Sequence, residues 1–242
     1  RIETIRQQRY ASRDYACFDD LLAEFLTGSD SIGAACFGVA GPTDGRNAKL
    51  TYLPWQLTAD TLEQNFAIGR VALINDFAAA AHGLPLVDDK DILTLHAGQP
   101  EPQAPRVILG AGTGLGVAGL IWQNGHYQVI PGEGGHFGFS PQTAEQGELW
   151  QSLLTKSGRV TVEDIVSGPG LSRIFAHFSG RPWEPEEIGQ AALAGTDPHA
   201  RAALRLWLEC YGAFAGVLAM HWLARGGVYL AGGMAAKLLP HI

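Results

Sequence analysis

The sequence has 242 residues, of which 46% are hydrophobic, and a formal net charge of -7. A chain of this length can bury one large core or two smaller ones, and its composition excludes a fibrous or disordered protein. With only 17 lysines and arginines it offers no basic surface to a nucleic-acid backbone, so we expect no nucleic-acid partner. No apolar run approaches the roughly 20 residues that span a bilayer, which argues against a membrane partner.

The three cysteines, Cys17, Cys36 and Cys210, lie far apart without a CxxC spacing. This pattern indicates neither a disulfide framework nor a structural zinc site. The first residues, 1–9, are charged and polar and have no signal-peptide core. We therefore expect a cytoplasmic protein.

Strands and helices are expected to alternate in the first part of the chain. Strand-like patterns occur at residues 1–10, 34–40, 49–53 and 71–74, and helical spacing occurs at residues 19–26 and 58–66. Thr58 is the predicted N-cap of the second helix. The last strand ends in two polar residues, Asn75 and Asp76, before an alanine-rich helix. Open α/β folds place ligands and catalytic groups at such strand ends, but an N-cap is an equally good interpretation of Asp76.

Two glycine-rich segments flank a predicted β-hairpin in the middle of the chain. The first, residues 110–116 (GAGTGLG), follows a predicted strand at residues 106–109. Its bare backbone N–H groups and the Thr113 hydroxyl suit a phosphate, although a tight turn between strands would have the same sequence. Because a strand follows, the segment is neither a Walker loop nor a Rossmann fingerprint. Asn124 and Gly125 predict the hairpin turn.

The second segment, residues 131–136 (PGEGGH), places Glu133 and His136 three residues apart on a backbone with little side-chain bulk. A carboxylate and an imidazole both form hydrogen bonds with hydroxyl groups. The pattern therefore suits a small polyhydroxylated ligand. The alternative is an exposed or mutually satisfied pair.

The remaining chain is predicted to be mainly helical. Helices are expected at residues 144–154, 160–166, 171–178 and 197–223, followed by a strand at residues 228–230 and a third glycine-rich segment at residues 231–233. Asp197 followed by Pro198 is a strong helix start. The apolar face of that helix includes Trp207, Val217 and His221, which we expect to pack in the core rather than to react.

Five motifs follow one another along the chain: INDF at residues 74–77, GAGTGLG at 110–116, PGEGGH at 131–136, EDIVSGPGL at 163–171 and YLAGGM at 229–234. In this order and spacing they resemble the bacterial glucokinase family, within the actin-like and hexokinase-like ATPases. The resemblance covers nearly the whole chain. It implies an α/β, ribonuclease H-like fold of two domains with a cleft between them. We expect a small domain at residues 1–86 and a large domain at residues 87–242.

The resemblance also implies a reaction, the ATP-dependent phosphorylation of D-glucose to glucose 6-phosphate, the first step of glycolysis. Asp76 corresponds to the family's general base, which takes the proton of the sugar 6-hydroxyl. The residues corresponding to sugar ligands are Asn75, Glu133, His136 and Glu163; those corresponding to the second phosphate loop are Gly112, Thr113 and Gly114, and those corresponding to the adenosine loop are Gly232 and Gly233. Mg²⁺ is expected with the nucleotide, and a homodimer is expected only from the resemblance.

The chain departs from the family pattern in three places. No DxGGTxxR phosphate loop occurs, and residues 1–10 resemble the strand that should follow it. The C-terminal strands and helix that follow the family's adenosine loop are also absent, so we expect a chain shortened at both ends. Tyr52 stands where the pattern LTNLPW has asparagine, so the resemblance does not define the residues at this edge of the sugar pocket. No cysteine lies near His136, so the resemblance is to the zinc-free branch, with no metal beyond Mg²⁺.

Two other functions remain open from the sequence. The first is a kinase for another hexose or an N-acetylhexosamine, or one that uses polyphosphate as donor. The second is a non-catalytic sugar sensor on the same fold. The missing first phosphate loop favours a sensor, whereas the retained Asp76 and the lack of a helix-turn-helix or basic segment favour an enzyme.

Overall fold

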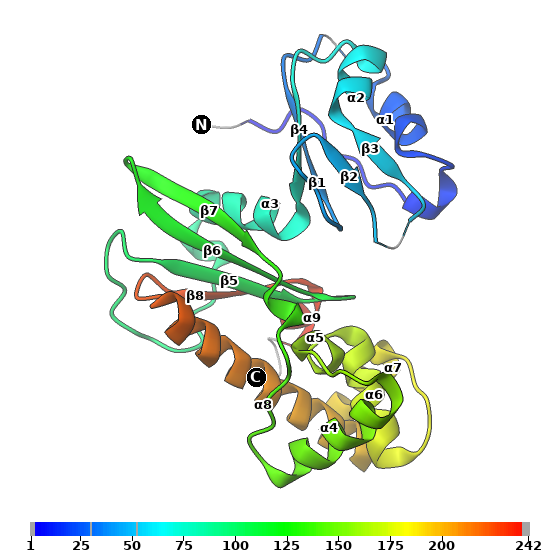
Figure 1. The fold of residues 1–242 in the computed structure, drawn as a ribbon, viewed down its shortest axis with the longest axis vertical. Helices are drawn as coiled ribbons and strands as arrows, with labels where there is room; N and C mark the ends of the chain where they lie inside the picture. The colour runs from blue at the N-terminus through cyan, green and yellow to red at the C-terminus, as the bar shows by residue number, and fades with distance from the viewer. Residues whose placement is uncertain (1–2, 30, 52, 239–242) are drawn as a thin grey trace. The chain divides into compact units, whose positions relative to one another are not determined.

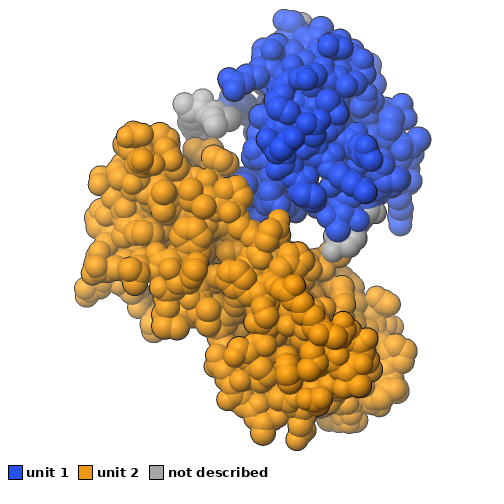
Figure 2. Space-filling model, viewed as in Figure 1, with its two compact units in different colours: residues 1–80 blue, residues 81–242 orange. Residues whose placement is uncertain are grey.

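The computed structural model describes residues 3–29, 31–51 and 53–238, so Tyr52 lies outside the described residues. The chain divides into two compact units, Arg1–Ala80 and Ala81–Ile242 (Figure 2). Each unit has its own hydrophobic core and is described by itself. The domain boundary expected after Leu86 stays a prediction.

The first unit combines two small sheets with helices (Figure 1). Its elements are η1 (Ser12–Asp14), α1 (Phe18–Leu26), β1 (Ala35–Val39), β2 (Asn47–Lys49), β3 (Gln56–Thr58), α2 (Ala59–Phe66), β4 (Val71–Asn75) and the start of α3 (Asp76–Gly83). Strand β1 pairs with β4 in parallel, and Val39 lies opposite Asn75. Strands β2 and β3 form an antiparallel pair. The predicted site residues Asn75 and Asp76 therefore lie at the end of this parallel pair, where β4 ends and α3 begins.

Arg46 connects β2 to α2 and β4 in the first unit. Its guanidinium donates to both carboxylate oxygens of Glu63, at 2.8 and 2.9 Å, and to the carbonyl of Val71 at 2.7 Å; it also contacts Asp60. Glu63 in turn accepts a hydrogen bond from the backbone N–H of Val71 at 2.7 Å. These bonds, with the Arg46 bond the largest cause, lower the pKa of Glu63 to about 2. The first residue of β4 is thus held from two sides.

Two strand predictions in the first unit are wrong. Residues 3–10 form no strand, because a strand needs a neighbouring strand and no backbone hydrogen bond joins these described residues to one. The strand expected at residues 49–53 ends at Lys49, because the chain turns back there and the N–H of Leu50 donates to the carbonyl of Trp55 at 3.1 Å. Pro54 lacks an N–H and could not have continued a ladder. Thr58 does precede α2, but its side chain makes no capping bond.

The second unit is built on a four-stranded sheet in the order β7-β6-β5-β8 (Figure 1). Its strands and short helices are η2 (Leu84–Leu86), η3 (Asp89–Asp91), β5 (Arg106–Ala111), β6 (Leu115–Gln123), β7 (His126–Gly132), η4 (Gly134–His136) and β8 (Val228–Ala231), and its longer helices are α4 (Ala144–Ser157), α5 (Val162–Ile165), α6 (Gly168–Ser179), α7 (Pro185–Ala194), α8 (Pro198–Trp222) and α9 (Gly233–Leu238). Strand β6 runs antiparallel to both β5 and β7, and β8 runs parallel to β5.

Local sequence signals predicted several of these elements. Asn124 and Gly125 have φ angles of 53° and 83°, which a tight hairpin turn between two strands requires, so the predicted hairpin is confirmed. Asp197 accepts a hydrogen bond from the N–H of Ala200 at 3.0 Å and caps α8 as predicted. Helix α7 was not predicted from the sequence, although Glu184 and Glu187 form a capping box at its start.

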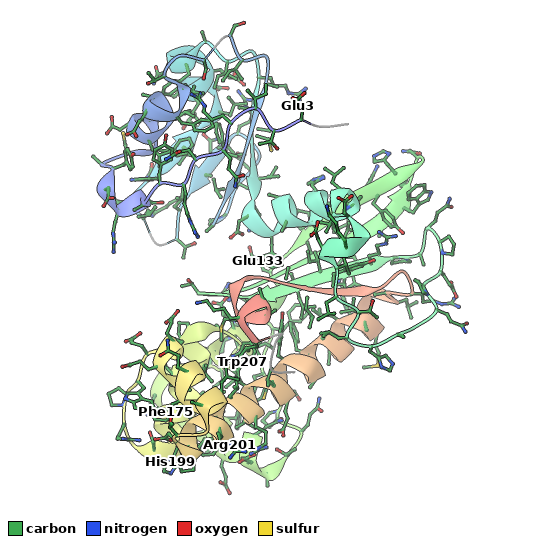
Figure 3. The ribbon with its side chains drawn as sticks, turned by 180° about the vertical axis from the view of Figure 1, so that it is seen from behind. Glu3, Glu133, Phe175, His199, Arg201 and Trp207 are labelled. Carbon is green, nitrogen blue, oxygen red and sulfur yellow. The ribbon has the colours of Figure 1, made fainter. Side chains whose placement is uncertain are left out.

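Helix α8 is the centre of the second unit's core. Trp207 on this helix, labelled in Figure 3, is fully buried, and its indole N–H donates to the carbonyl of Ser167 at 3.0 Å. The predicted burial of Val217 and His221 is wrong, because both are exposed. Helices α6 and α7 have 12 and 10 residues and cover only part of the 25-residue α8.

By length and composition, α8 could also cross a membrane, and it is the one such helix in the described part of the chain. This is weak evidence, because the core helix of a globular protein satisfies the same criteria. Leu206 and Trp207 on α8 are fully buried among residues of the second core. Their packing indicates a core helix.

Candidate functional site

The predicted base lies where β4 ends and α3 begins. Asn75 Oδ1 accepts hydrogen bonds from the N–H groups of Phe77 at 2.9 Å and Ala78 at 3.1 Å. Asp76 is exposed, and its Oδ1 accepts a second bond from the Phe77 N–H at 2.8 Å. The capping role that the sequence left open for Asp76 therefore falls mainly to Asn75. Asp76 Oδ2 makes no hydrogen bond to the described residues.

A glycine allows β1 to lie against the start of α3. A Cβ on Gly38 would be 2.9 Å from the Cβ of Ala79 and 3.6 Å from the Cα of Asp76. Any larger residue at position 38 would push this helix turn away from the sheet. Gly38 is therefore a support for Asp76 that the sequence motifs did not identify.

The first glycine-rich segment forms a tight turn between β5 and β6, as a strand-turn-strand sequence predicts. The N–H of Gly112 donates to the carbonyl of Gly114 at 2.8 Å, which closes the turn. The N–H groups of Thr113 and Gly114 make no backbone hydrogen bond in the described part of the chain, and the Thr113 side chain is exposed. Two adjacent donors and a hydroxyl are thus left for an anion such as a phosphate.

Glu163 lies against this turn from α5. Its Oε2 accepts a hydrogen bond from the N–H of Leu115 at 2.7 Å. A Cβ on Gly114 would lie 2.7 Å from the same oxygen, so only glycine lets the carboxylate approach this closely. At the start of α6, which follows α5, the N–H of Gly168 donates to the carbonyl of Gly112 at 2.8 Å. The predicted phosphate loop is thus joined to the predicted sugar ligand.

The second glycine-rich segment forms η4 and lies on the other side of Leu115. A Cβ on Gly135 would collide with the Leu115 carbonyl oxygen, which explains the need for glycine there. Glu133, labelled in Figure 3, precedes this turn and His136 ends it, and their side chains are 72% and 60% exposed. Glu133 Oε2 and His136 Nε2 are 3.8 Å apart, which is too long for a hydrogen bond. Both groups therefore remain available to a ligand.

The chain that follows η4 is held beside α5. The N–H of Val162 donates to the carbonyl of Phe137 at 2.9 Å, and the N–H of Phe139 donates to the carbonyl of Val160 at 3.0 Å. Arg159 donates to the His136 carbonyl at 2.9 Å. These bonds bring the segment with Glu133 and His136 to the element that carries Glu163.

The third glycine-rich segment lies next to the first one in the sheet. Ala231 at the end of β8 is in register with Gly110 on β5. Gly232 has a φ of 89°, and a Cβ on it would be 2.7 Å from the carbonyl oxygen of Ala111. Gly233 then begins α9. The two segments predicted to hold the phosphates and the adenosine are therefore neighbours.

The second unit thus brings together most of the predicted site. It holds Glu133, His136, Glu163, Gly112, Thr113, Gly114, Gly232 and Gly233, whereas Asn75 and Asp76 belong to the first unit. The motifs did not single out the N–H of Leu115 or the buried side chain of Ser167. A serine followed two residues later by proline is a helix-start signal that could have identified Ser167, whose hydroxyl accepts from the N–H of Gly170.

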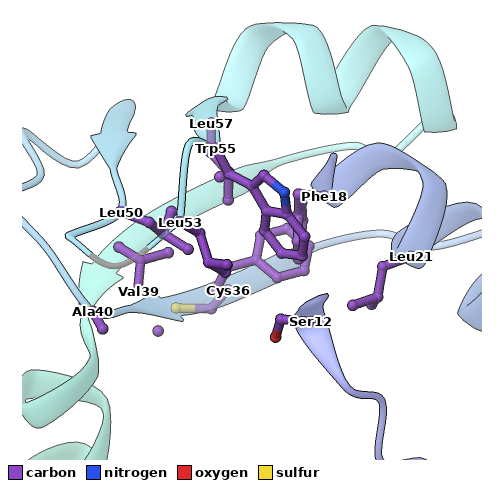
Figure 4. A pocket seen from close by; sticks show the side chains of 12 residues that line it. Ser12, Phe18, Leu21, Cys36, Val39, Ala40, Leu50, Leu53, Trp55 and Leu57 are labelled. Carbon is purple, nitrogen blue, oxygen red and sulfur yellow. The ribbon is translucent and has the colours of Figure 1, made fainter. Parts of the chain in front are cut away.

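The first unit also contains an apolar cavity of about 300 Å³ (Figure 4). Its lining includes Phe18, Cys36, Leu53 and Trp55 and no charged side chain. A sugar needs several hydrogen-bonding groups, so this cavity does not fit one. None of the predicted site residues lines it.

No group of three or more histidine, cysteine, aspartate or glutamate side chains within the described residues could hold a metal ion. All three cysteines are unpaired, with Cys17 and Cys36 exposed and Cys210 buried.

Comparison with known proteins identifies close relatives. A family model described as Glucokinase matches residues 1–242. A glucokinase from Nostoc sp. is 38% identical, and the match covers 100% of this chain and 80% of that protein. The crystal structure of a glucokinase from an Antarctic psychrotroph is 26% identical, with a TM-score of 0.82, and the match covers 96% of this chain and 74% of that one.

A more distant structure supports the same fold. It is a ROK family glucokinase from Streptomyces griseus in complex with glucose and AMPPNP, 21% identical, with a TM-score of 0.58 over 90% of this chain and 72% of that one. The fold is the actin-like and hexokinase-like ATPase fold that the motif order predicted.

Proposed function

This chain belongs to the glucokinase family, and on that premise we propose that it transfers the γ-phosphoryl group of ATP to the 6-hydroxyl of D-glucose. Phosphoryl transfer needs mainly a base, a rigid cage for the acceptor and donors for the phosphates. One observation carries the proposal. In the second unit, the N–H of Leu115 holds Glu163 beside the N–H groups of Thr113 and Gly114, which make no backbone hydrogen bond to the described residues. The turn that connects Glu133 to His136 lies against the carbonyl oxygen of Leu115.

We assign the sugar to the polar side chains of the motifs. Glu133, His136 and Glu163 would bind its ring hydroxyls, since a carboxylate accepts from a hydroxyl and an imidazole can donate or accept. The Nδ2 group of Asn75 would donate to a further hydroxyl, because its Oδ1 is engaged by the start of α3. A sugar lacking one of these hydroxyls would leave a polar group unpaired once the bound sugar shields that group from water, which gives specificity.

The proton of the 6-hydroxyl would pass to Asp76. Its Oδ1 is held by the N–H of Phe77, which orients the carboxylate and leaves Oδ2 for the proton. A positioned base of this kind contributes about 10²- to 10⁴-fold to a rate. The 6-oxygen is then ready to attack the γ-phosphorus as the bond to ADP breaks.

The nucleotide would lie along the two neighbouring glycine-rich segments. The N–H groups of Thr113 and Gly114 and the Thr113 hydroxyl would bind phosphate oxygens, and Gly232 with Gly233 would contact the adenosine. The structural neighbour that holds AMPPNP supports ATP as the donor. Mg²⁺ would arrive bound to the phosphates and neutralise their charge, which requires few protein ligands. We further propose a cytoplasmic enzyme and a homodimer.

The experiment is a substrate panel on the intact protein. Glucose, mannose, fructose, N-acetylglucosamine and N-acetylmannosamine are each mixed with Mg²⁺ and ATP, and ADP release is followed by a coupled assay. We expect the highest kcat/KM for glucose, with the product phosphate on O6 by phosphorus NMR. Faster turnover of another sugar would mean that glucose is not the preferred substrate. Turnover with polyphosphate alone would mean that ATP is not the required phosphate donor. Calorimetric glucose binding without any ADP release would show a sensor instead.

A further inference from the structure

We propose that Glu163 is a positioning residue for the phosphate loop as well as a sugar ligand, so that one carboxylate connects the two substrate sites. The inference rests on the proposed function and deepens it. Glu163 Oε2 holds the N–H of Leu115 at 2.7 Å, the first residue after the turn at residues 112–114. Its Oε1 makes no hydrogen bond to the described residues and remains for a sugar hydroxyl.

The bond acts on the residues that would bind phosphate. Leu115 follows Gly114 directly, and the N–H groups of Thr113 and Gly114 are the unpaired donors of the turn. A carboxylate that accepts a backbone N–H forms a charge-assisted bond, which is stronger than a neutral one. Movement of the Glu163 side chain therefore moves or releases the end of the loop.

The backbone that carries the Glu163 side chain is itself held in a defined place. The Ser167 hydroxyl donates to the Glu163 carbonyl at 2.7 Å, and the Trp207 indole donates to the Ser167 carbonyl at 3.0 Å. Ser167 and Trp207 are both buried. The backbone of α5 is thus fixed to the core of the second unit, and the loop is attached to this fixed point through one side chain.

Glucose and nucleotide should therefore influence each other's binding through Glu163. A sugar hydroxyl bound to Oε1 restricts the same carboxylate that holds Leu115, and an ordered loop keeps that carboxylate in place for the sugar. Coupling of this kind is reciprocal in binding free energy. A residue that served the sugar alone would not change nucleotide affinity when glucose is absent.

Two glycines of the same loop provide a matched test. A Cβ on Gly114 would lie 2.7 Å from Glu163 Oε2, whereas a Cβ on Gly112 would meet no atom within 4 Å. Because the obstructed atom is the end of a flexible side chain, G114A can fold by moving the carboxylate away from Leu115. We expect G114A to weaken glucose binding about tenfold, measured by calorimetry without nucleotide, and G112A to change it less than about twofold.

A double-mutant cycle shows whether the effect passes through Glu163. In an E163A background the added methyl group at position 114 has no carboxylate to displace. G114A should then change glucose affinity less than about twofold. E163A alone should weaken AMPPNP binding about threefold or more in the absence of glucose, because the loop loses its bond to Leu115. Circular dichroism of each variant verifies folding.

The outcomes separate this inference from the proposed function. If the wild-type protein binds and phosphorylates glucose but G114A keeps its glucose affinity, the link through Glu163 is wrong and the function stands. The same conclusion follows if G114A and E163A are additive, or if E163A leaves AMPPNP affinity unchanged. If the wild-type protein neither binds nor phosphorylates glucose, the proposed function fails and this inference fails with it.

Discussion

Asn75 and Asp76 are consecutive residues at the start of α3, but only Asn75 uses its side chain to cap the helix. Asn75 Oδ1 accepts from the N–H groups of both Phe77 and Ala78, while Asp76 is exposed and, among the described residues, accepts only from Phe77. A carboxylate that served as the cap could not easily take a proton from a substrate. The capping by Asn75 leaves Oδ2 of Asp76 for the proton transfer that we propose.

The first prediction concerns Asp76. D76N in the intact protein should lower kcat for glucose phosphorylation about 10²- to 10⁴-fold, because the amide cannot accept the 6-hydroxyl proton. Glucose affinity should stay within a few fold, since the amide keeps the size and one acceptor oxygen. Steady-state kinetics and calorimetry measure the two quantities. D20N, which changes an exposed carboxylate on α1, is the control, and near-normal turnover of D76N would contradict the assignment.

The second prediction compares two helix caps. Ser167 caps α6 through a 3.0 Å bond from Gly170, and Thr143 caps α4 through a 3.2 Å bond from Gln146. S167A and T143A should each lower the free energy of unfolding by about 0.5–2 kcal/mol in denaturant titrations. Only S167A should also weaken glucose binding, because Ser167 fixes the backbone of Glu163. Equal losses of glucose affinity in both variants would mean that the cap at Ser167 has no specific part in the site.

The third prediction is a pH dependence of stability in the first unit. The pKa of Glu63 is lowered to about 2 mainly by its bond from Arg46, against an ordinary value of 4.5. The folded state therefore binds fewer protons than the unfolded state between these values. The stabilisation is present above about pH 4.5 and is lost as the pH falls towards 2.

Denaturant titrations between pH 2 and pH 6 should show this loss in the wild-type protein and a smaller loss in E63Q, whose amide does not titrate. E3Q, which removes an exposed carboxylate, serves as the control. Parallel pH profiles of the wild-type protein and E63Q would show that the Arg46 pair contributes nothing measurable.

The fourth prediction concerns thiol reactivity. Burial, as the largest cause, raises the pKa of Cys210 to about 12, so this thiol carries almost no thiolate at pH 8. Cys17 and Cys36 are exposed. Mass spectrometry after brief alkylation of the native protein should find label on Cys17 and Cys36 and not on Cys210, and all three should react in denaturant. Native labelling of Cys210 would mean that the core around α8 opens readily.

Local structure follows from the sequence wherever a short-range signal is strong enough. The turn at Asn124 and Gly125 needs positive φ angles that these two residue types tolerate, and Asp197 with Pro198 supplies both a cap and a suitable first helical residue. The order of the five motifs was sufficient to predict the family and the fold.

The wrong predictions share a different cause. Residues 3–10 have a strand-like pattern but make no backbone hydrogen bond to a strand in the described part of the chain, and His221 continues the apolar pattern of α8 but is exposed. Pairing and burial depend on what lies beside a residue, and a pattern within one segment does not contain that information.

The sequence by itself determined which chemical groups this protein carries, including the acid Asp76 and the carboxylate Glu163. Only the tertiary structure decided what each group contacts. The bond between Glu163 and Leu115 joins residues 48 positions apart, and it depends on the absence of a side chain at Gly114. Such a contact arises when the sheet and α5 pack together, because folding brings distant backbone and side-chain groups within hydrogen-bonding distance.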